Sequence, residues 1–266
     1  MAAILSVDDI AFSYSGNRFI EKLCALFEEG KLYGIVGPNG CGKTTLIHLL
    51  AGYLRPGAGR ILLQGKPLAR YPKRELARKI ALVPQDFAIH FPFSVRELVM
   101  MGRYPHMARF SPPSHLDRQR VEEALAATDT AAFAHRYVTE LSGGERQRVV
   151  TARALAQDTP VLLLDEAASN LDIRHALALF SQVRERVEKK GVTAVAVFHD
   201  INMAARTCDD LILMKEGQIE AAGPVGEVLT PENLLRVFDI EARVRFEPFI
   251  EADQVIFAEA QKWTMN

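Results

Sequence analysis

The segment that most constrains the fold is Gly37-Pro-Asn-Gly-Cys-Gly-Lys-Thr44, which fits the pattern G-x-x-x-x-G-K-[ST]. It follows the apolar run 33–36 and opens the helix-like run 44–51, the strand–loop–helix context that the pattern requires. Glycines let such a loop turn tightly and gather backbone N–H groups around one phosphate, and the helix start adds the positive end of its dipole. A chance glycine-rich turn is the alternative, which the flanking strand and helix disfavour. The sequence therefore predicts a nucleotide site.

Two side chains at the end of this loop suit a nucleoside triphosphate. We expect Lys43 to reach the β and γ phosphates and the Thr44 hydroxyl to take a place on a magnesium ion. Cys41 precedes a helix start, which lowers thiol pKa values, so we expect a reactive thiol that ATP would protect from a maleimide. The predicted nucleotide contacts of the loop are Gly37, Pro38, Asn39, Gly40, Cys41, Gly42, Lys43, Thr44 and Thr45.

Polar residues end three other apolar runs. Asp165 and Glu166 follow the run 161–164, where a buried parallel strand would point them at the ligand crevice. We expect Asp165 to hold magnesium and Glu166 to polarise an attacking water. His199 follows the run 194–198 and is expected beside the γ phosphate, holding the water or Glu166. Gln85 follows the run 80–84, and its amide could ligate the magnesium or the water. Taken singly, each of these residues would be a solvated strand end or a structural residue.

The wider pattern predicts an α/β fold. Short apolar runs alternate with helix-like segments, which is typical of a mostly parallel core sheet covered on both faces. The runs between residues 5 and 63 are closer together and indicate an antiparallel β piece. From about 86 to 157 no strand is obvious, and we expect an inserted α-helical subdomain. We expect one domain over 1–239 and a tail over 240–266, of unknown role, whose alternation indicates a hairpin.

Composition excludes several classes of protein. The chain of 266 residues has 32 Lys and Arg against 33 Asp and Glu, a balance that argues against a protein that wraps nucleic acid. It has no apolar run of about 18 residues, which a membrane-spanning helix needs. The N-terminus has no signal-peptide pattern, and three cysteines indicate reduced thiols in the cytosol. We interpret the basic cluster as a solvated face: Arg70, Lys73, Arg74, Arg78 and Lys79.

A second candidate anion site lies at Leu141-Ser-Gly-Gly-Glu145. Ser142 is placed to cap a helix, and the two glycines after it would expose backbone N–H groups at the helix start. A plain helix cap explains the same residues. One nucleotide rarely needs two such sites in one chain.

Together these motifs resemble those of the ATP-binding subunits of ATP-binding cassette (ABC) transporters, over about residues 5–238. The resemblance implies a P-loop NTPase fold of ABC type and an ATPase that uses ATP and Mg²⁺. It identifies 141–145 as the signature, 161–166 as Walker B and 169–172 as the D-loop. Tyr14 falls where the family stacks an aromatic ring on adenine.

The resemblance also implies a second copy of the chain. In the family two subunits close head to tail, so that Ser142, Gly143 and Gly144 of one copy would meet the ATP held by the other, and Asp172 joins the predicted nucleotide residues. Two departures stand out: Ala167 and Ala168 replace the common proline and threonine, and Glu145 replaces the commoner glutamine.

Three stretches, 71–85, 93–106 and 199–209, resemble the branch that imports iron chelates, haem and cobalamin, some members of which carry molybdate or tungstate. This implies integral membrane permease subunits as partners, an indirect periplasmic or extracellular substrate-binding protein, no nucleic acid, and a peripheral place on the cytoplasmic face of the cell membrane. A permease helix would dock beside Gln85, with apolar anchors and a polar rim at Phe91, Phe93, Val95, Leu98, Arg96 and Glu97. The alternative is that the apolar residues of this set pack the insert onto the core, as some of them must. The alternative is a soluble ABC ATPase that acts on nucleic acid or protein, which a pull-down would discriminate.

Overall fold

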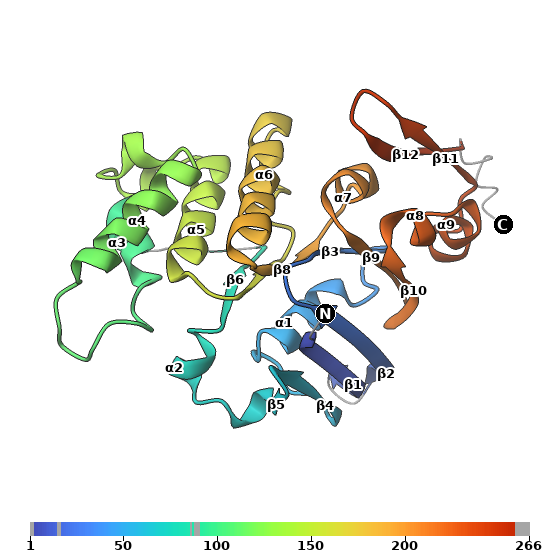
Figure 1. Ribbon diagram of the computed structural model, residues 1–266, viewed down its shortest axis with the longest axis horizontal. Coiled ribbons are helices and arrows are strands. Elements are labelled where there is room, and N and C mark those ends of the chain that lie inside the picture. Colours follow the sequence, from blue (N-terminus) through green and yellow to red (C-terminus); the bar gives the residue numbers. More distant parts are fainter. Residues whose placement is uncertain (1–2, 15–16, 86, 88–90, 259–266) are drawn as a thin grey trace.

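The computed structural model describes residues 3–14, 17–85, 87 and 91–258. Within these residues the core is a six-stranded sheet in the order β10-β9-β3-β8-β7-β6 (Figure 1). Strands β9, β3, β8, β7 and β6 run parallel to one another, and β10 is antiparallel to β9. This confirms the mostly parallel core that the short apolar runs predict. The strands are β3 (Leu32–Val36), β6 (Ile80–Val83), β7 (Val161–Leu164), β8 (Thr193–Val197), β9 (Asp210–Lys215) and β10 (Gln218–Pro224).

The predicted antiparallel piece is a separate sheet in the order β2-β1-β4-β5. The runs 5–7 and 11–14 belong to one strand, because a shift in register between Asp8 and Ala11 lets β1 continue past polar residues. The apolar pattern does not predict β2, since Glu21 and Lys22 interrupt it. The strands are β1 (Ala3–Tyr14), β2 (Asn17–Glu28), β4 (Ala58–Leu63) and β5 (Lys66–Pro67).

Helix α1 (Lys43–Leu50) packs between the two sheets. Its Leu46 and Leu50 are fully buried in one cluster with Leu5 of the antiparallel sheet and Val195 of the core sheet. Burial on both sides holds the helix by the hydrophobic effect. The loop before α1 is therefore fixed at the edge of the core sheet.

Three helices form the insert between β6 and β7: α3 (Val95–Met101), α4 (His115–Ala127) and α5 (Gly143–Gln157). Each begins with a capping box, in which a serine and an acid three residues later satisfy the first backbone N–H groups. A buried ion pair, Arg103 Nε to Asp117 Oδ1 at 3.0 Å, joins the end of α3 to α4. This confirms the inserted helical subdomain. Short helices precede β6 at Leu68–Arg70 and α2 (Lys73–Leu76), and two more lie inside the insert, between α4 and α5, at Ala131–Phe133 and Val138–Glu140.

Further helices follow the strands β7 to β10. They are α6 (Ile173–Lys190), α7 (Ile201–Thr207), α8 (Val225–Val228) and α9 (Pro231–Phe238). Residues of α6, α7 and α9 share a second buried cluster with the inserted helices, on the face of the core sheet opposite α1. The core sheet is thus covered on both faces, as its apolar strands require.

The tail forms the expected hairpin, β11 (Ala242–Glu247) paired antiparallel with β12 (Ala252–Phe257). It lies beside α7 and α9 rather than extending away from the domain (Figure 1). Val255 of β12 is 5% exposed and belongs to the buried cluster that contains α9. The hairpin is therefore packed onto the domain that precedes it.

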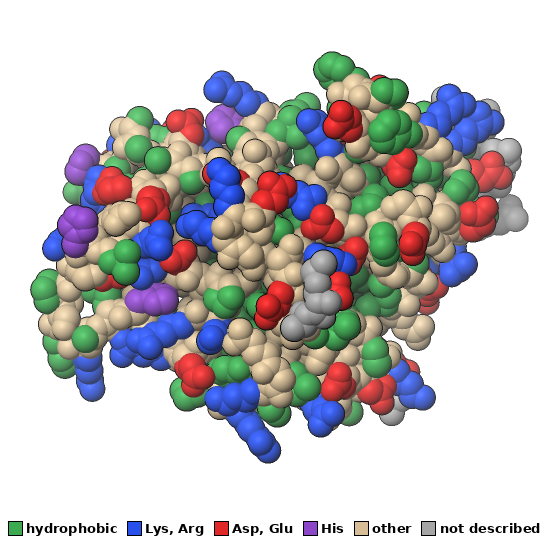
Figure 2. Space-filling model, in the orientation of Figure 1, with side chains coloured by type: hydrophobic (Ala, Val, Ile, Leu, Met, Phe, Trp, Pro, Cys, Tyr) green, Lys and Arg blue, Asp and Glu red, His purple; other side chains and the backbone are tan. Residues whose placement is uncertain are grey.

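Basic side chains gather around α2, at the lower left of the view in Figure 2. Arg70, Lys73, Arg74 and Arg78 are exposed, in agreement with a solvated face. Arg78 Nε also donates to the Pro105 carbonyl at 2.7 Å, so part of the cluster secures the loop after α3. In the described part of the chain, no helix combines the length and apolar character needed to span a bilayer.

Candidate nucleotide site

The phosphate loop joins β3 to α1 and depends on glycine at two positions. Gly42 caps α1 with a φ of 109°, which side chains disfavour. A Cβ on Gly37 would lie 2.1 Å from the Met214 carbonyl oxygen, so no other residue fits there. Lys43, which is 5% exposed, donates from Nζ to the carbonyl oxygens of Gly37 at 2.8 Å and Pro38 at 2.9 Å. The loop thus folds around the ammonium group of Lys43.

Asp165 and Thr44 meet beside this loop, although they are far apart in the sequence. The Thr44 hydroxyl donates to Asp165 Oδ1 at 3.0 Å, and Asp165 is 1% exposed. Burial raises the pKa of the Asp165 carboxyl, against the lowering effect of the Thr44 hydrogen bond. Among the described residues, Asp165 Oδ2 has no hydrogen-bond partner. The pair therefore presents an unused buried carboxylate oxygen and a hydroxyl oxygen, the hard ligands that Mg²⁺ prefers.

Gln85 and His199 both contact one carboxylate oxygen of Glu166. His199 Nε2 lies 2.6 Å from Glu166 Oε2, and the Gln85 side-chain amide donates to the same oxygen. The three residues come from the ends of three core strands, β6, β7 and β8. Glu166 is 8% exposed and has a φ of 50°, a left-handed conformation that is uncommon for a residue with a side chain. The backbone turn after β7 thus presents the carboxylate to its two partners.

Tyr14 lies at the rim of the loop. Its hydroxyl is 3.3 Å from the Thr45 hydroxyl, and its side chain is 48% exposed. Phe12 packs against the ring edge-on, with the ring centroids 4.7 Å apart. The structure therefore places an accessible aromatic ring beside the phosphate loop, where stacking on a base requires one.

The expectation of a reactive Cys41 is wrong. Cys41 is 4% exposed, and burial raises the pKa of its thiol although Lys43 and nearby N–H groups act in the opposite direction. Desolvation therefore outweighs the effect of the helix start. Cys41 packs inside the loop as a small apolar residue.

The signature residues lie on the helical insert. Ser142 caps α5, its hydroxyl accepting from Glu145 N at 3.3 Å and donating to Glu145 Oε2 at 2.9 Å. The glutamate that replaces the commoner glutamine thus completes a capping box. Ser142 and Gly143 are exposed, and within the described residues no hydrogen bond joins them to the phosphate loop. These hydrogen bonds therefore do not bring the phosphate loop and the second candidate anion site together within one chain.

Asp172 also serves its own helix. It caps α6 by accepting from His175 N at 2.9 Å, and its carboxylate stays 67% exposed. Ala167, one of the two departures from the family pattern, is buried at 1% exposure directly after Glu166. The loop from Glu166 to Asp172 thus carries two turns and a cap, and a nucleotide contact of Asp172 stays a prediction.

Sequence reasoning missed His48, whose Nε2 lies 3.8 Å from Asp165 Oδ2. His48 follows Thr44 by four residues in α1, so both side chains lie on one helix face. That spacing was available in the sequence. It could have placed His48 beside the Thr44–Asp165 pair.

Two of the proposed docking anchors are core residues. Val95 and Leu98 are 0% and 2% exposed, because they pack α3 onto the insert, whereas Phe91 and Phe93 are 69% and 37% exposed. The rim residues are also engaged: Arg96 pairs with Glu122, and Glu97 completes the cap of α3. The docking surface is thus smaller at this segment than predicted.

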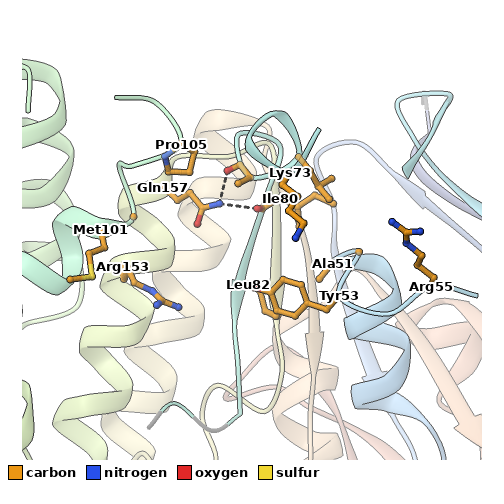
Figure 3. Close-up of a pocket in the computed structure, with 14 residues that line it drawn as sticks. Ala51, Tyr53, Arg55, Lys73, Ile80, Leu82, Met101, Pro105, Arg153 and Gln157 are labelled. Carbon is orange, nitrogen blue, oxygen red and sulfur yellow. Dashed lines mark hydrogen bonds between the residues drawn. The ribbon is translucent and has the colours of Figure 1, made fainter. Parts of the chain in front are cut away.

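A cavity of about 660 Å³ lies nearby, between the core and the insert (Figure 3). Tyr53 and Leu82 line it from the core side, and Arg153 points into it from α5. Gln157 closes one end by donating to the carbonyl oxygens of Ala77 at 2.6 Å and Ile80 at 2.9 Å. The cavity is therefore a groove with an apolar wall, and burial there lowers the pKa of Arg153.

The loop between β3 and α1 and the carboxylates at the strand ends define a P-loop nucleotide-binding protein. The family model described as ABC transporter matches residues 21–169, and the chain belongs to this family. The resemblance of the motifs is thereby confirmed, as is the ATP-binding character of the fold.

Two curated proteins illustrate the similarity. A cobalamin import ATP-binding protein of Halobacterium salinarum is 41% identical over 92% of this chain, which spans 61% of that relative's length. A hemin import ATP-binding protein of Rhodopseudomonas palustris is 38% identical over 92% of this chain and 94% of its own.

Two solved structures share the fold. One is a metal-chelate type ABC transporter in an inward-facing conformation, with a TM-score of 0.82, 30% identity and 97% of each chain covered. The other is a dimeric ATP-binding cassette bound to ADP and phosphate, with a TM-score of 0.74 and 26% identity over 83% of this chain and 98% of its own.

Proposed function

We propose that this protein is the ATP-hydrolysing subunit of an ABC importer that takes up a metal chelate through separate membrane permease subunits. The observation that carries the hydrolytic role is the meeting of Gln85 and His199 on one oxygen of Glu166, beside the phosphate loop. A carboxylate held in this way can polarise a water for attack on a phosphate. The importer role is supported by the relatives and by the metal-chelate type transporter described above.

The phosphate loop would bind ATP by exchanging contacts that it already makes. Lys43 Nζ would leave the carbonyl oxygens of Gly37 and Pro38 for the β and γ phosphates, whose charge it neutralises. Backbone N–H groups of residues 39–45 would surround the phosphates, and Tyr14 would stack on the base. Stacking tolerates any base, so selection for ATP over other nucleotides would be weak.

The residues beside the loop fit a magnesium ion. Thr44 and Asp165 would hold it, with Gln85 at the edge of the site, because Asp165 Oδ2 is buried without a hydrogen bond among the described residues. When bound, Mg²⁺ would neutralise charge on the β and γ phosphates. Glu166 would accept the proton of the attacking water, and His199 would keep the carboxylate in place.

A second copy would complete the site. Gly143 and Gly144 place their backbone N–H groups at the start of α5, beside the exposed Ser142 that caps the helix. Head-to-tail closure of two copies would bring this helix start to the γ phosphate held by the partner. The dimeric form of the similar cassette supports this arrangement.

The groove between the core and the insert would receive a short helix of the permease. Its apolar wall at Tyr53 and Leu82 would anchor that helix, and Arg153 would supply a polar contact. The exposed Phe93 would extend the contact. Such docking would keep the protein on the cytoplasmic face of the membrane, and an extracytoplasmic binding protein would deliver cargo to the permease.

A transport assay tests the whole proposal. Cells that lack this chain would receive either the wild-type protein or Glu166→Gln, and uptake of an iron siderophore, haem, cobalamin and molybdate would be measured in that order. We expect one cargo to enter the cells that received the wild-type chain and not those that received Glu166→Gln. A polytopic membrane protein should co-purify with both chains. Recovery of soluble protein or nucleic acid instead, with no cargo restored, would favour a soluble ABC ATPase.

A further inference from the structure

The C-terminal hairpin is joined to α7 by the side-chain amide of Asn202. Its Oδ1 accepts a hydrogen bond from the Val255 N–H at 2.7 Å, and its Nδ2 donates to the Val255 carbonyl at 3.2 Å. Val255 lies opposite Val244 in the hairpin, and because its N–H and its carbonyl oxygen both bond to Asn202, both backbone groups point away from β11. The Asn202 amide therefore pairs with the free edge of β12 as a neighbouring strand would.

Apolar packing makes this contact firm. Val255 is 5% exposed and lies in one buried cluster with residues of α7, α8 and α9, such as Ala204, Val228 and Val237. Phe257 packs edge-on against Phe238 at the end of α9, with 6.1 Å between ring centroids. The hairpin is thus anchored on α9 and reaches α7 through β12, as Figure 1 shows.

Asn202 lies in the first turn of α7, three residues after His199. Between them, Asp200 caps the same turn by accepting from the backbone N–H groups of Asn202 at 2.8 Å and Met203 at 3.3 Å. The His199 side chain itself is 48% exposed and meets Glu166 at 2.6 Å. Because half of the ring faces solvent, its position depends strongly on the backbone that leaves β8 and enters α7.

We propose that the C-terminal hairpin braces the first turn of α7 through Asn202 and thereby positions His199 on Glu166. The inference rests on the proposed function, because it gives His199 a role in hydrolysis. Among the described residues the Asn202 side chain bonds to Val255 and not to Glu166 or His199, so it acts as a positioning residue. Loss of the brace lets the turn and the imidazole shift, and misplacement by about 1 Å can slow a reaction by up to about a hundredfold.

The first test compares two asparagines. Asn202→Ala removes the brace and leaves the Asp200 cap, which uses the backbone of residue 202. Asn233→Ala is the matched control, because Asn233 Nδ2 likewise donates to a carbonyl, that of Val228 at 2.8 Å, but in α9. We expect Asn202→Ala to lower the kcat of ATP hydrolysis on the order of tenfold with the same ATP affinity, and Asn233→Ala to keep kcat, at similar melting temperatures.

A second variant removes the brace from the hairpin side. Val255→Pro deletes the N–H that donates to Asn202 Oδ1. The hydrogen bonds between β11 and β12 remain, because this N–H faces away from β11. We expect the same fall in kcat as for Asn202→Ala, and no larger fall when both substitutions are combined. A normal kcat in a folded Val255→Pro chain would overturn the inference.

The decisive measurement is a cycle with His199. If Asn202 acts through His199, Asn202→Ala should cause no further loss of kcat in a His199→Ala chain. An equal loss in both backgrounds, or a lower melting temperature with normal kcat in Asn202→Ala alone, would show a merely structural contact and overturn the inference. A His199→Ala chain as fast as the wild type would instead overturn the proposed function, and the brace with it.

Discussion

The phosphate loop and the signature both place glycines at the start of a helix, but the chain treats the two segments in opposite ways. Lys43 and Asp165 are 5% and 1% exposed at the loop, whereas Ser142 is exposed at the signature. The loop buries its charged groups, and electrostatic interactions are stronger in a buried site than in water. The signature keeps a satisfied helix cap in solvent. A site shared between two copies requires one half that is buried and preorganised and another half that is exposed to the partner copy.

The largest effect should come from the buried half. Glu166→Gln keeps the shape of the side chain and removes the charge that polarises water. We expect hydrolysis to fall about a hundredfold or more, ATP to remain bound, and an ATP-locked dimer to accumulate in size-exclusion chromatography. Near-normal turnover would show that Glu166 does not take part in hydrolysis, and the buried half would then have no catalytic role.

Lys43→Ala should come next in size. The substitution removes the cation that would neutralise the β and γ phosphates, and loss of one partner of a buried charge pair costs about 2–5 kcal/mol. We therefore expect ATP affinity, measured by equilibrium binding, to weaken on the order of a hundredfold. Asn233→Ala provides the control for general damage to the fold. Unchanged affinity would show that the loop does not hold the phosphates.

The sequence alone reveals the loop and the strand ends because their chemistry depends on residues close together in the chain. It does not reveal that Gln85 and His199 share one oxygen of Glu166, since nothing in the sequence signals the left-handed φ of 50° at Glu166. The sequence shows that Val95 and Leu98 are apolar. It does not show whether these side chains pack inward or meet a partner, and the structure shows that they pack inward.

A mixture of two inactive chains separates the halves directly. Ser142→Arg would place a bulky side chain over the helix start, while Lys43→Ala disables the loop. Each chain alone should be inactive, but a mixed dimer has one site with an intact loop from the Ser142→Arg copy and an intact signature from the Lys43→Ala copy. We expect part of the ATPase activity to return on mixing. Activity that stays at the level of either chain would show that the halves are not shared.

Substitutions at the proposed docking surface should have a smaller effect, seen in transport but not in the isolated subunit. Tyr53→Ala and Phe93→Ala truncate exposed rings, so neither should disturb the core. We expect ATPase activity of the isolated subunit within about twofold of wild type and cargo uptake to fall several-fold, because exposed aromatic anchors carry much of the energy of an interface. Val95→Ala is the contrasting core variant, which should lower the melting temperature. A parallel fall of ATPase and melting temperature in Phe93→Ala would place Phe93 in the core instead.

The smallest effect should be that of ATP on the labelling of Cys41, because this thiol is buried in the loop. Cys24 is exposed, whereas Cys41 and Cys208 are buried and have raised thiol pKa values. Since the thiolate is the reacting form, a raised pKa means that less of it exists near neutral pH, and the reaction should speed up only as pH rises toward that pKa. A maleimide should therefore label Cys24 first, and Cys41 only after denaturation, with little dependence on ATP. Rapid labelling of Cys41 in the native chain, blocked by ATP, would show that the loop opens to solvent and that the buried half is less closed than Lys43 and its carbonyl partners indicate.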